Sequence, residues 1–262
     1  MGLIFDIKEF ALNDGSGIRT TVFFKGCPLR CAWCHNPEGL SPRRELYLKQ
    51  KGCTHCGLCQ RPCNHPDCQG LGRCLHICPR NLVSVAGVEW EPEALAEKLL
   101  KQADVYRETG GGVTLSGGEP LLQWEFACAL LDCLHGRVHT TIETSGYADA
   151  DAFLAVIGRC DFVYMDLKLM DGEKHKTFTG VPNDRILHNA EWLMASGKPH
   201  TFRTPLIPGV TDTEENLSAI RAFIGDNAWE QLPYNNLAPA KYASVGRVYA
   251  LDSVRNAEKR EK

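Results

Sequence analysis

Hydrophobic residues are patterned in two different ways along this chain. After about residue 90, short apolar runs alternate with segments whose apolar residues recur at helical spacing. Such strand–helix repeats predict a parallel β-sheet with helices packed on it. Between residues 38 and 88, long apolar runs are missing and cysteines are dense. The pattern therefore predicts one α/β domain that is interrupted by an insert.

The same pattern predicts the individual elements. Strands are expected at residues 3–10, 19–26, 113–116, 140–144, 161–167, 200–205 and 230–233. Helices are expected at residues 92–107, 122–134, 150–157, 186–195 and 213–224. Residues 3–10 alternate between apolar and polar as an edge strand does, and the glycine-rich residues 13–17 form a turn. Six strand–helix repeats favour an open or partial barrel over a closed barrel of eight strands.

Composition narrows the class of protein. A chain of 262 residues with 44% hydrophobic content can bury a substantial core. Its net charge of −3 gives no excess of positive charge that would attract nucleic acid or an anionic membrane surface. No apolar run approaches the roughly 20 residues of a membrane span, and the first residues lack a charged-then-apolar leader. We therefore expect a cytoplasmic protein that binds neither nucleic acid nor membrane.

Cysteines are concentrated in one part of the chain. Ten of the thirteen lie between Cys27 and Cys78. In a cytosolic chain of this length, such a density indicates metal binding rather than disulfides. The other three, Cys128, Cys133 and Cys160, fall in apolar segments and are expected to be buried as small hydrophobic residues.

The first three cysteines form a C-x₃-C-x₂-C motif directly after an expected strand. They are Cys27, Cys31 and Cys34. Three thiolates on a short loop can hold an iron–sulfur cube and leave one iron open, whereas electron carriers of this type normally use four cysteines. The alternative is a structural zinc site, for which His35 could be the fourth ligand.

The cysteines of the insert follow the spacing of a bacterial ferredoxin. They are Cys53, Cys56, Cys59, Cys63, Cys68, Cys74 and Cys78, the last of which precedes Pro79. The ferredoxin run is C-x₂-C-x₂-C-x₃-C-P, and its fourth cysteine ligates the other cluster. Residues 50–85 are therefore predicted to be a ferredoxin-like insert, with zinc knuckles as the alternative.

The second run of the insert lacks one cysteine, because Leu71 stands in its second place. If the fourth cysteine of each run ligates the other cluster, one cluster is held by Cys53, Cys56, Cys59 and Cys78. The other cluster has Cys63, Cys68 and Cys74 and is one ligand short. The candidates for its fourth ligand are His65, Asp67, His76 and a water, and the alternative is a three-iron cluster.

Polar motifs fall at the ends of the expected parallel strands, where sites form in such sheets. Two glycines before Glu119 let backbone groups approach a ligand, and this loop suits an α-amino acid. Asp166 and Lys168 lie on one face of their strand by alternation, either as part of a site or as a local ion pair. Arg203 is either a carboxylate anchor in the same pocket or a solvated strand-end residue.

These motifs together carry a resemblance to a known family. C-x₃-C-x₂-C with Trp33 before the third cysteine resembles the radical S-adenosylmethionine (SAM) enzymes. The additional motifs narrow it to the activating enzymes of glycyl radical enzymes; they are DGSGIRT at 14–20, CHNP at 34–37, SGGEP at 116–120, DLK at 166–168 and LPYN at 232–235. The resemblance covers nearly the whole chain.

The resemblance implies a function and its cofactors. SAM would chelate the open iron of a catalytic 4Fe-4S cluster, and its reductive cleavage would give a 5′-deoxyadenosyl radical that takes hydrogen from a glycine Cα of a partner enzyme. It also implies a flavodoxin or ferredoxin-type electron donor, a monomer, and one or two further clusters in the insert. Residues 1–37 and 86–262 would form a six-stranded partial barrel of the radical SAM type, and many activating enzymes carry the insert at 50–85.

The resemblance also assigns residues. Those implied to contact SAM are Trp33, His35, Gly117, Gly118, Glu119, Asp166, Lys168, Arg203 and Asn235. Gly117, Gly118 and Glu119 would meet the SAM amine, and Asn235 stands where some relatives use a histidine for the ribose. Glu143 and Asp166 match positions that hold a monovalent cation in related activases. After Lys241 and Tyr242 about twenty residues remain, fewer than family members usually have.

Two other classes of function remain open from the sequence. One is a radical SAM enzyme that acts on a small molecule or activates a ribonucleotide reductase. The other is a non-catalytic electron-transfer or zinc protein. The sequence does not identify the partner enzyme.

Overall fold

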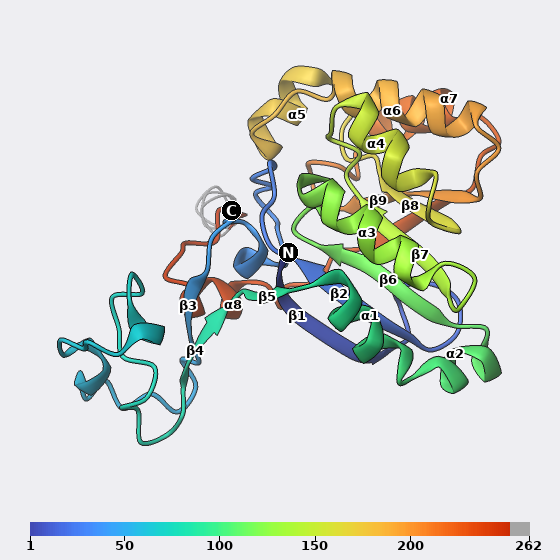
Figure 1. The fold of residues 1–262 in the computed structure, drawn as a ribbon. Coiled ribbons are helices and arrows are strands. Elements are labelled where there is room, and N and C mark those ends of the chain that lie inside the picture. The colour runs from blue at the N-terminus through green and yellow to red at the C-terminus, as the bar shows by residue number, and fades with distance from the viewer. Residues whose placement is uncertain (252–262) are drawn as a thin grey trace, which may run out of the picture.

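A single eight-stranded sheet organises the computed structural model, which describes residues 1–251 (Figure 1). Its strand order is β10-β9-β8-β7-β6-β2-β1-β5. The strands are β1 (Gly2–Ala11), β2 (Arg19–Phe24), β5 (Val88–Trp90), β6 (Gly112–Gly117), β7 (His139–Thr144), β8 (Phe162–Asp166), β9 (His200–Leu206) and β10 (Trp229–Pro233). From β2 to β10 all neighbours pair in parallel, whereas β1 is antiparallel to β2 and to β5. The predicted α/β fold with a mostly parallel sheet is confirmed.

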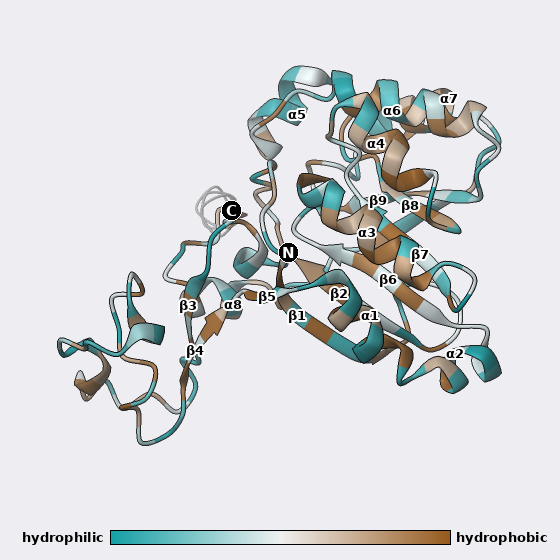
Figure 2. Cartoon of the chain, viewed as in Figure 1, coloured by the Kyte–Doolittle hydropathy of each residue, from teal (hydrophilic) through white to brown (hydrophobic). Residues whose placement is uncertain are grey.

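Helices connect the parallel strands and pack on one face of the sheet (Figure 1). They are α1 (Pro92–Leu100), α2 (Ala103–Thr109), α3 (Trp124–Leu134), α4 (Ala150–Ile157), α6 (Asp184–Ala195) and α7 (Glu214–Ile224). Helix α5 (Gly172–Thr179) packs through Phe178 on a second cluster that includes Trp33, and α8 (Pro239–Ser244) follows β10. Alternate strand residues such as Val22, Leu115 and Met165 are fully buried in the core with Leu131 of α3. Figure 2 shows hydrophobic residues along these strands and along α3 and α4. No described helix is long and apolar enough to span a membrane.

The opposite face of the sheet is polar. Because side chains alternate along a strand, the neighbours of the core residues point away from the helices. Residues on this face include Thr21, Thr114, Ser116, Thr141, Glu143, Tyr164 and Arg203. The buried Arg19 lies among them and donates hydrogen bonds to Thr114 Oγ1 (2.6 Å) and Thr141 Oγ1 (3.0 Å). The sheet therefore has one apolar face for folding and one polar face that leads to the site.

Two expectations about the elements are wrong. Strand β1 is not an edge, because β5 pairs with its first three residues, Gly2 to Ile4. The single helix expected at 92–107 is broken after Leu100, where Gln102 N bonds to Leu99 O in a tighter turn. Leu99 O also accepts a hydrogen bond from the Tyr106 hydroxyl (3.2 Å). The break therefore allows the Tyr106 side chain to be buried in the core. The short helices α5 and α8 were not expected.

Residues 45–86 form a separate projection beside the sheet (Figure 1). Its stem is an antiparallel pair, β3 (Glu45–Leu48) and β4 (Val83–Ala86). Beyond the stem, the described chain forms loops and short 3₁₀ turns with no longer element. The loss of the strand–helix pattern in this region, predicted from the sequence, is confirmed. At the other end, the expectation about the length of the C-terminus concerns residues 252–262 in part, which lie outside the described residues.

Candidate active site

The loop of residues 27–34, called the cysteine loop below, leaves the carboxyl end of β2, as predicted. Its base is fixed by a backbone hydrogen bond from Gly26 N to Gly39 O (2.8 Å). Its outer part is fixed by a bond from Ala32 N to Phe178 O of α5 (2.9 Å). Backbone bonds at both ends therefore define where the three thiols lie, whatever they bind.

The surroundings of these thiols fit an iron–sulfur cluster. Burial raises the pKa of the Cys31 thiol to about 12, while the nearby charge of Lys168 acts in the opposite direction. The backbone N–H of Asn36 lies 3.4 Å from Cys34 Sγ. Iron binds thiolates, so a cation and an N–H donor beside the sulfurs support the charged form. The zinc alternative with His35 is not supported, since these residues form no metal-ligand group with atoms within 4.8 Å of one another in residues 1–251.

The glycine pair at the end of β6, Gly117 and Gly118, packs against the end of β2 and the base of the cysteine loop. A Cβ on Gly118 would lie 2.2 Å from Gly26 O and 2.6 Å from Gly39 O. Gly117 has φ +112°, and a Cβ there would lie 2.4 Å from Phe24 N. Glycine is therefore needed at both positions to let two loops touch, a reason that the sequence did not reveal. Their contact with SAM remains a prediction.

Glu119 is buried and braces the neighbouring strands. Its carboxylate accepts hydrogen bonds from Thr144 Oγ1 (2.6 Å), Ser145 N (2.8 Å), Ser145 Oγ (2.5 Å) and Leu121 N (3.2 Å). Four donors occupy the four lone-pair sites of a carboxylate. The side chain thus joins the end of β6 to the end of β7. Its predicted contact with the SAM amine remains a prediction, and the structure adds this bracing role.

Asp166 and Lys168 form the ion pair that alternation predicted, with 2.7 Å between Asp166 Oδ2 and Lys168 Nζ. Burial opposes the lysine charge, but Asp166 and the thiols of Cys31 and Cys27 outweigh it and raise the pKa of Lys168. The ammonium therefore remains charged beside the cysteine loop. The predicted cation between Asp166 and Glu143 remains a prediction, and neither residue belongs to a metal-ligand group of three or more within residues 1–251.

Arg203 is held by two carboxylates and an aromatic ring. Its guanidinium lies 2.7 Å from Glu143 Oε1 and 2.7 Å from Glu230 Oε2. The same group stacks 3.3 Å over the centroid of the Tyr164 ring. Glu143 Oε2 also accepts the Ser116 hydroxyl (2.6 Å). Arg203 is thus buried and paired, which excludes the solvated alternative, while its predicted role as a SAM anchor remains a prediction.

Two predicted residues from opposite ends of the chain meet at this edge. The His35 ring donates to the backbone carbonyl of Asn235, and burial lowers the pKa of His35. Trp33 is buried and packs against Phe178 with 6.4 Å between the ring centroids. The structure thus brings the cysteine loop next to the segment that follows β10.

Sequence reasoning missed the contribution of α8. The Tyr242 side chain makes a hydrogen bond to Cys34, and burial together with the neighbouring thiols raises the pKa of Tyr242. Lys241 Nζ lies 3.1 Å from Glu38 Oε1 and 3.3 Å from Asn36 Oδ1. A tyrosine next to a lysine near the end of the chain was the only signal in the sequence, and it is too weak to predict these contacts.

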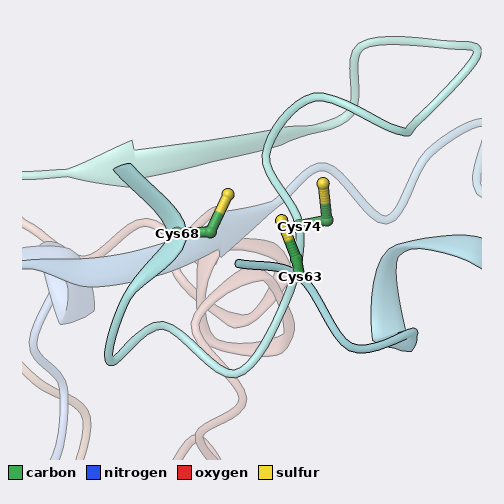
Figure 3. A group of neighbouring side chains, drawn as sticks. All are labelled: Cys63, Cys68 and Cys74. Atoms are coloured by element: carbon green, nitrogen blue, oxygen red, sulfur yellow. The ribbon is translucent and has the colours of Figure 1, made fainter. Parts of the chain in front are cut away.

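The cysteines of the insert lie in two places, and the clusters predicted for them remain a prediction. One hollow of about 410 Å³ is lined by all four members of the first group, Cys53, Cys56, Cys59 and Cys78. The Sγ atoms of the second group, Cys63, Cys68 and Cys74, all lie within 4.8 Å of one another (Figure 3). Of the three cysteines outside these motifs, Cys128 and Cys160 are buried as predicted, and Cys133 is half-buried.

The fold and this edge define a class of protein. Residues 21–219 match the family described as the radical SAM superfamily. The solved structure of Streptococcus suis SuiB bound to S-adenosylmethionine has a TM-score of 0.52 at 16% identity, over 89% of this chain and 44% of that chain. At this identity the likeness concerns the fold alone.

Curated relatives narrow the class. The chain is 36% identical to the 4-hydroxyphenylacetate decarboxylase activating enzyme of Clostridioides difficile, over 95% of this chain and 86% of the relative. It is 37% identical to the isethionate sulfite-lyase activating enzyme of Desulfovibrio desulfuricans, over 97% and 89%. The chain belongs to the radical SAM superfamily and, within it, to the activating enzymes of glycyl radical enzymes. The predicted family, function and use of SAM with a 4Fe-4S cluster are confirmed.

We expect Gly118→Ala to lower the iron content of the catalytic site. The new Cβ would press on two backbone carbonyls at the base of the cysteine loop. Overpacking of this kind costs about 1–3 kcal/mol, which displaces a loop more readily than it unfolds a domain. Iron and sulfide per chain, with circular dichroism for the fold, measure the effect.

The matched control is Gly172→Ala, whose Cβ would meet only the side-chain Asn183 Oδ1 at 3.2 Å. Unchanged iron in Gly118→Ala would contradict the packing argument.

Proposed function

We propose that this activating enzyme holds its catalytic cluster on Cys27, Cys31 and Cys34 and binds SAM beside it at the carboxyl edge of the sheet. The observation that carries the proposal is the buried Lys168 ammonium, which is charged, paired with Asp166 and next to the thiols. When bound, the cluster supplies the electron that cleaves SAM to methionine and a 5′-deoxyadenosyl radical, which takes hydrogen from a glycine Cα of the partner.

The chain's own residues position the reactants. The proposed SAM contacts are Trp33, His35, Gly117, Gly118, Glu119, Asp166, Lys168, Arg203 and Asn235. Lys168 offsets the negative charge of the thiolates and of the SAM carboxylate in a setting of low polarity, where such attraction is strong. The buried Glu119 and Arg203 keep the ends of the strands in fixed positions, so that little reorganisation accompanies the reaction.

The substrate in this proposal is a loop of a protein rather than a small molecule. A glycyl radical is stabilised by its two flanking amide groups, so the partner enzyme can store it. The two relatives named above are activating enzymes of a decarboxylase and of a sulfite-lyase, which makes the partner loop the variable part of the system. We propose that the chain acts as a monomer and receives electrons from a flavodoxin or ferredoxin-type donor.

The insert is the proposed entry point for those electrons. We assign residues 50–85 to a ferredoxin-like unit and residues 1–37 and 86–262 to a six-stranded partial barrel. In support, Arg73 Nη1 donates to Cys59 Sγ (3.2 Å) at the edge of the four-cysteine hollow. The insert also contacts the catalytic edge, because Gln50 Nε2 donates to Ala243 O of α8 (2.9 Å).

Two measurements test the proposal against its alternatives. SAM cleavage by the dithionite-reduced protein separates an enzyme from an electron carrier or a zinc protein. A glycyl radical signal in the EPR spectrum of an added partner enzyme separates an activase from an enzyme that acts on small molecules. A SAM-cleaving protein that forms no such radical with any glycyl radical enzyme encoded near its gene would contradict the activase assignment.

Cys31→Ala should abolish SAM cleavage and leave most of the iron of the insert in place. The reason is that the two cysteine groups lie in separate parts of the fold, one on the loop after β2 and the other beyond the stem of β3 and β4. Cleavage rates and iron per chain measure both halves of the prediction. Cys133→Ala is the matched control, since this half-buried cysteine lies in α3. Wild-type cleavage in Cys31→Ala would exclude the ligand assignment.

Lys168→Ala should weaken SAM binding by about tenfold or more with little change in iron content. A hydrogen bond to a charged group contributes about 1.5–3 kcal/mol, and 1.4 kcal/mol is tenfold in affinity. Calorimetric titration of the anaerobic protein with SAM measures the loss. Lys174→Ala is the control, because this exposed lysine pairs with Glu215 on the surface. An unaltered SAM affinity in Lys168→Ala would remove this lysine from the pocket.

A further inference from the structure

The second cysteine group of the insert is built for a metal centre but lacks a thiolate. Cys63, Cys68 and Cys74 point toward one another, with all Sγ atoms within 4.8 Å (Figure 3). Leu71 occupies the place at which a ferredoxin run has its remaining cysteine. An open position at this centre has to be filled by another side chain or by solvent.

Backbone amides are arranged to support thiolates at all three positions. Leu75 N lies 3.4 Å from Cys68 Sγ. The backbone N–H of His65 donates to Cys63, and that of His76 donates to Cys74. Hydrogen bonds to the sulfurs are one of the means by which proteins adjust iron–sulfur clusters. The arrangement fits charged ligands rather than neutral thiols.

Two histidines complete the surroundings. Ring nitrogens of His65 and His76 and the Sγ of Cys68 form a second group within 4.8 Å, and the ring centroids are 4.3 Å apart. Cys68 belongs to both groups, so the histidines lie next to the three thiols. This second group is an observation independent of the cysteine spacing, and it brings the nitrogen ligands to the open position.

Hydrogen bonding distinguishes the two rings. His65 Nδ1 accepts the backbone N–H of Asp67 (3.3 Å), so in the neutral ring the proton is on Nε2 and neither nitrogen is free to bind iron. Asp67 Oδ2 lies 3.5 Å from both His65 Nδ1 and His76 Nε2. The difference is that His65 Nδ1 already accepts the Asp67 N–H, a bond that His65 would lose if Nδ1 had to donate to the carboxylate. A histidine ligand usually donates its other ring N–H to a carboxylate. In this arrangement His76 Nδ1 is the nitrogen left to act as a ligand.

We propose that His76 is the fourth ligand of the cluster held by Cys63, Cys68 and Cys74, with Asp67 orienting its ring. The proposal rests on the iron–sulfur role proposed above for the insert. A single zinc ion would gather all four ligand atoms around one point. Within residues 1–251, however, the metal-ligand groups contain three members each and share only Cys68. The separate place of the histidine nitrogens fits a ligand that binds its own iron of a cluster, and the closely spaced thiols would have to move apart to bind the other irons.

The ligand set makes the two centres of the insert unequal. A neutral imidazole in place of a thiolate makes the cluster less negative, and histidine ligation raises the reduction potential in the known example of Rieske centres. The centre of Cys63, Cys68 and Cys74 should therefore be reduced more easily than the centre of Cys53, Cys56, Cys59 and Cys78. Electrons would then rest on the histidine-bearing centre.

Pulsed EPR of the reduced protein without SAM tests the assignment. The full chain is produced with ¹⁵N-labelled histidine, reconstituted anaerobically, and compared with His76→Ala and with the matched control His65→Ala. We expect a strong coupling to imidazole nitrogen in the wild-type protein and in His65→Ala, and its loss in His76→Ala. Iron should approach the roughly twelve per chain of three full cubes.

A second variant keeps the test valid if His76→Ala disturbs the insert. Leu71→Cys combined with His76→Ala restores the fourth thiolate, so it should regain full iron, lack the nitrogen coupling and show a lower midpoint potential in a redox titration.

The proposal is overturned by any of four results: no imidazole coupling in the wild-type protein, coupling that survives His76→Ala, a three-iron signal in the oxidised protein, or zinc at this site. Because none of these measurements uses SAM or a partner enzyme, loss of glycyl radical formation with intact coupling would instead count against the proposed function.

Discussion

The contact between the glycine loop after β6 and the base of the cysteine loop is the constraint on which the site depends. Gly118 lies so close to two backbone carbonyls that no side chain fits, and the Glu119 carboxylate accepts three hydrogen bonds from Thr144 and Ser145 at the end of β7. One four-residue turn thus fixes β2, β6 and β7 relative to one another. Because the thiols follow directly after β2, their separation is set by backbone packing rather than by flexible side chains.

Charge on the polar face of the sheet is balanced pair by pair. The ladder places Asp166 beside Arg203 and Glu143 beside Tyr164. Arg203 bridges Glu143 and Glu230, while Asp166 pairs with Lys168. Buried charges need such partners, since an unpaired one would cost several kcal/mol. The pairing also points the one ammonium of the set, Lys168, toward the cysteines, where negative charge accumulates.

Much of this arrangement could be predicted from the sequence, because periodicity and spacing are local. The parallel strands, the cysteine motifs and the pairing of Asp166 with Lys168 all follow from residue order. Contacts between segments that are far apart in the sequence could not be predicted in this way. Nothing local indicates that β5 covers β1 or that Tyr242 reaches Cys34. Alternating polar residues inside buried strands, such as Thr141 and Glu143, were the overlooked signal for a polar second face.

The position of the insert depends on a network that no single motif encodes. Lys25, fully buried near the end of β2, donates to Glu45 Oε2 of the stem (2.7 Å) and to Glu38 O (2.7 Å). Arg247 binds the same Glu45 and the carbonyl of Pro37. Lys25 and Arg247 therefore each bind both the stem and the segment after the cysteine loop. Movement of the insert would strain the buried lysine, so the projection is tied to the catalytic edge although it folds outside the sheet.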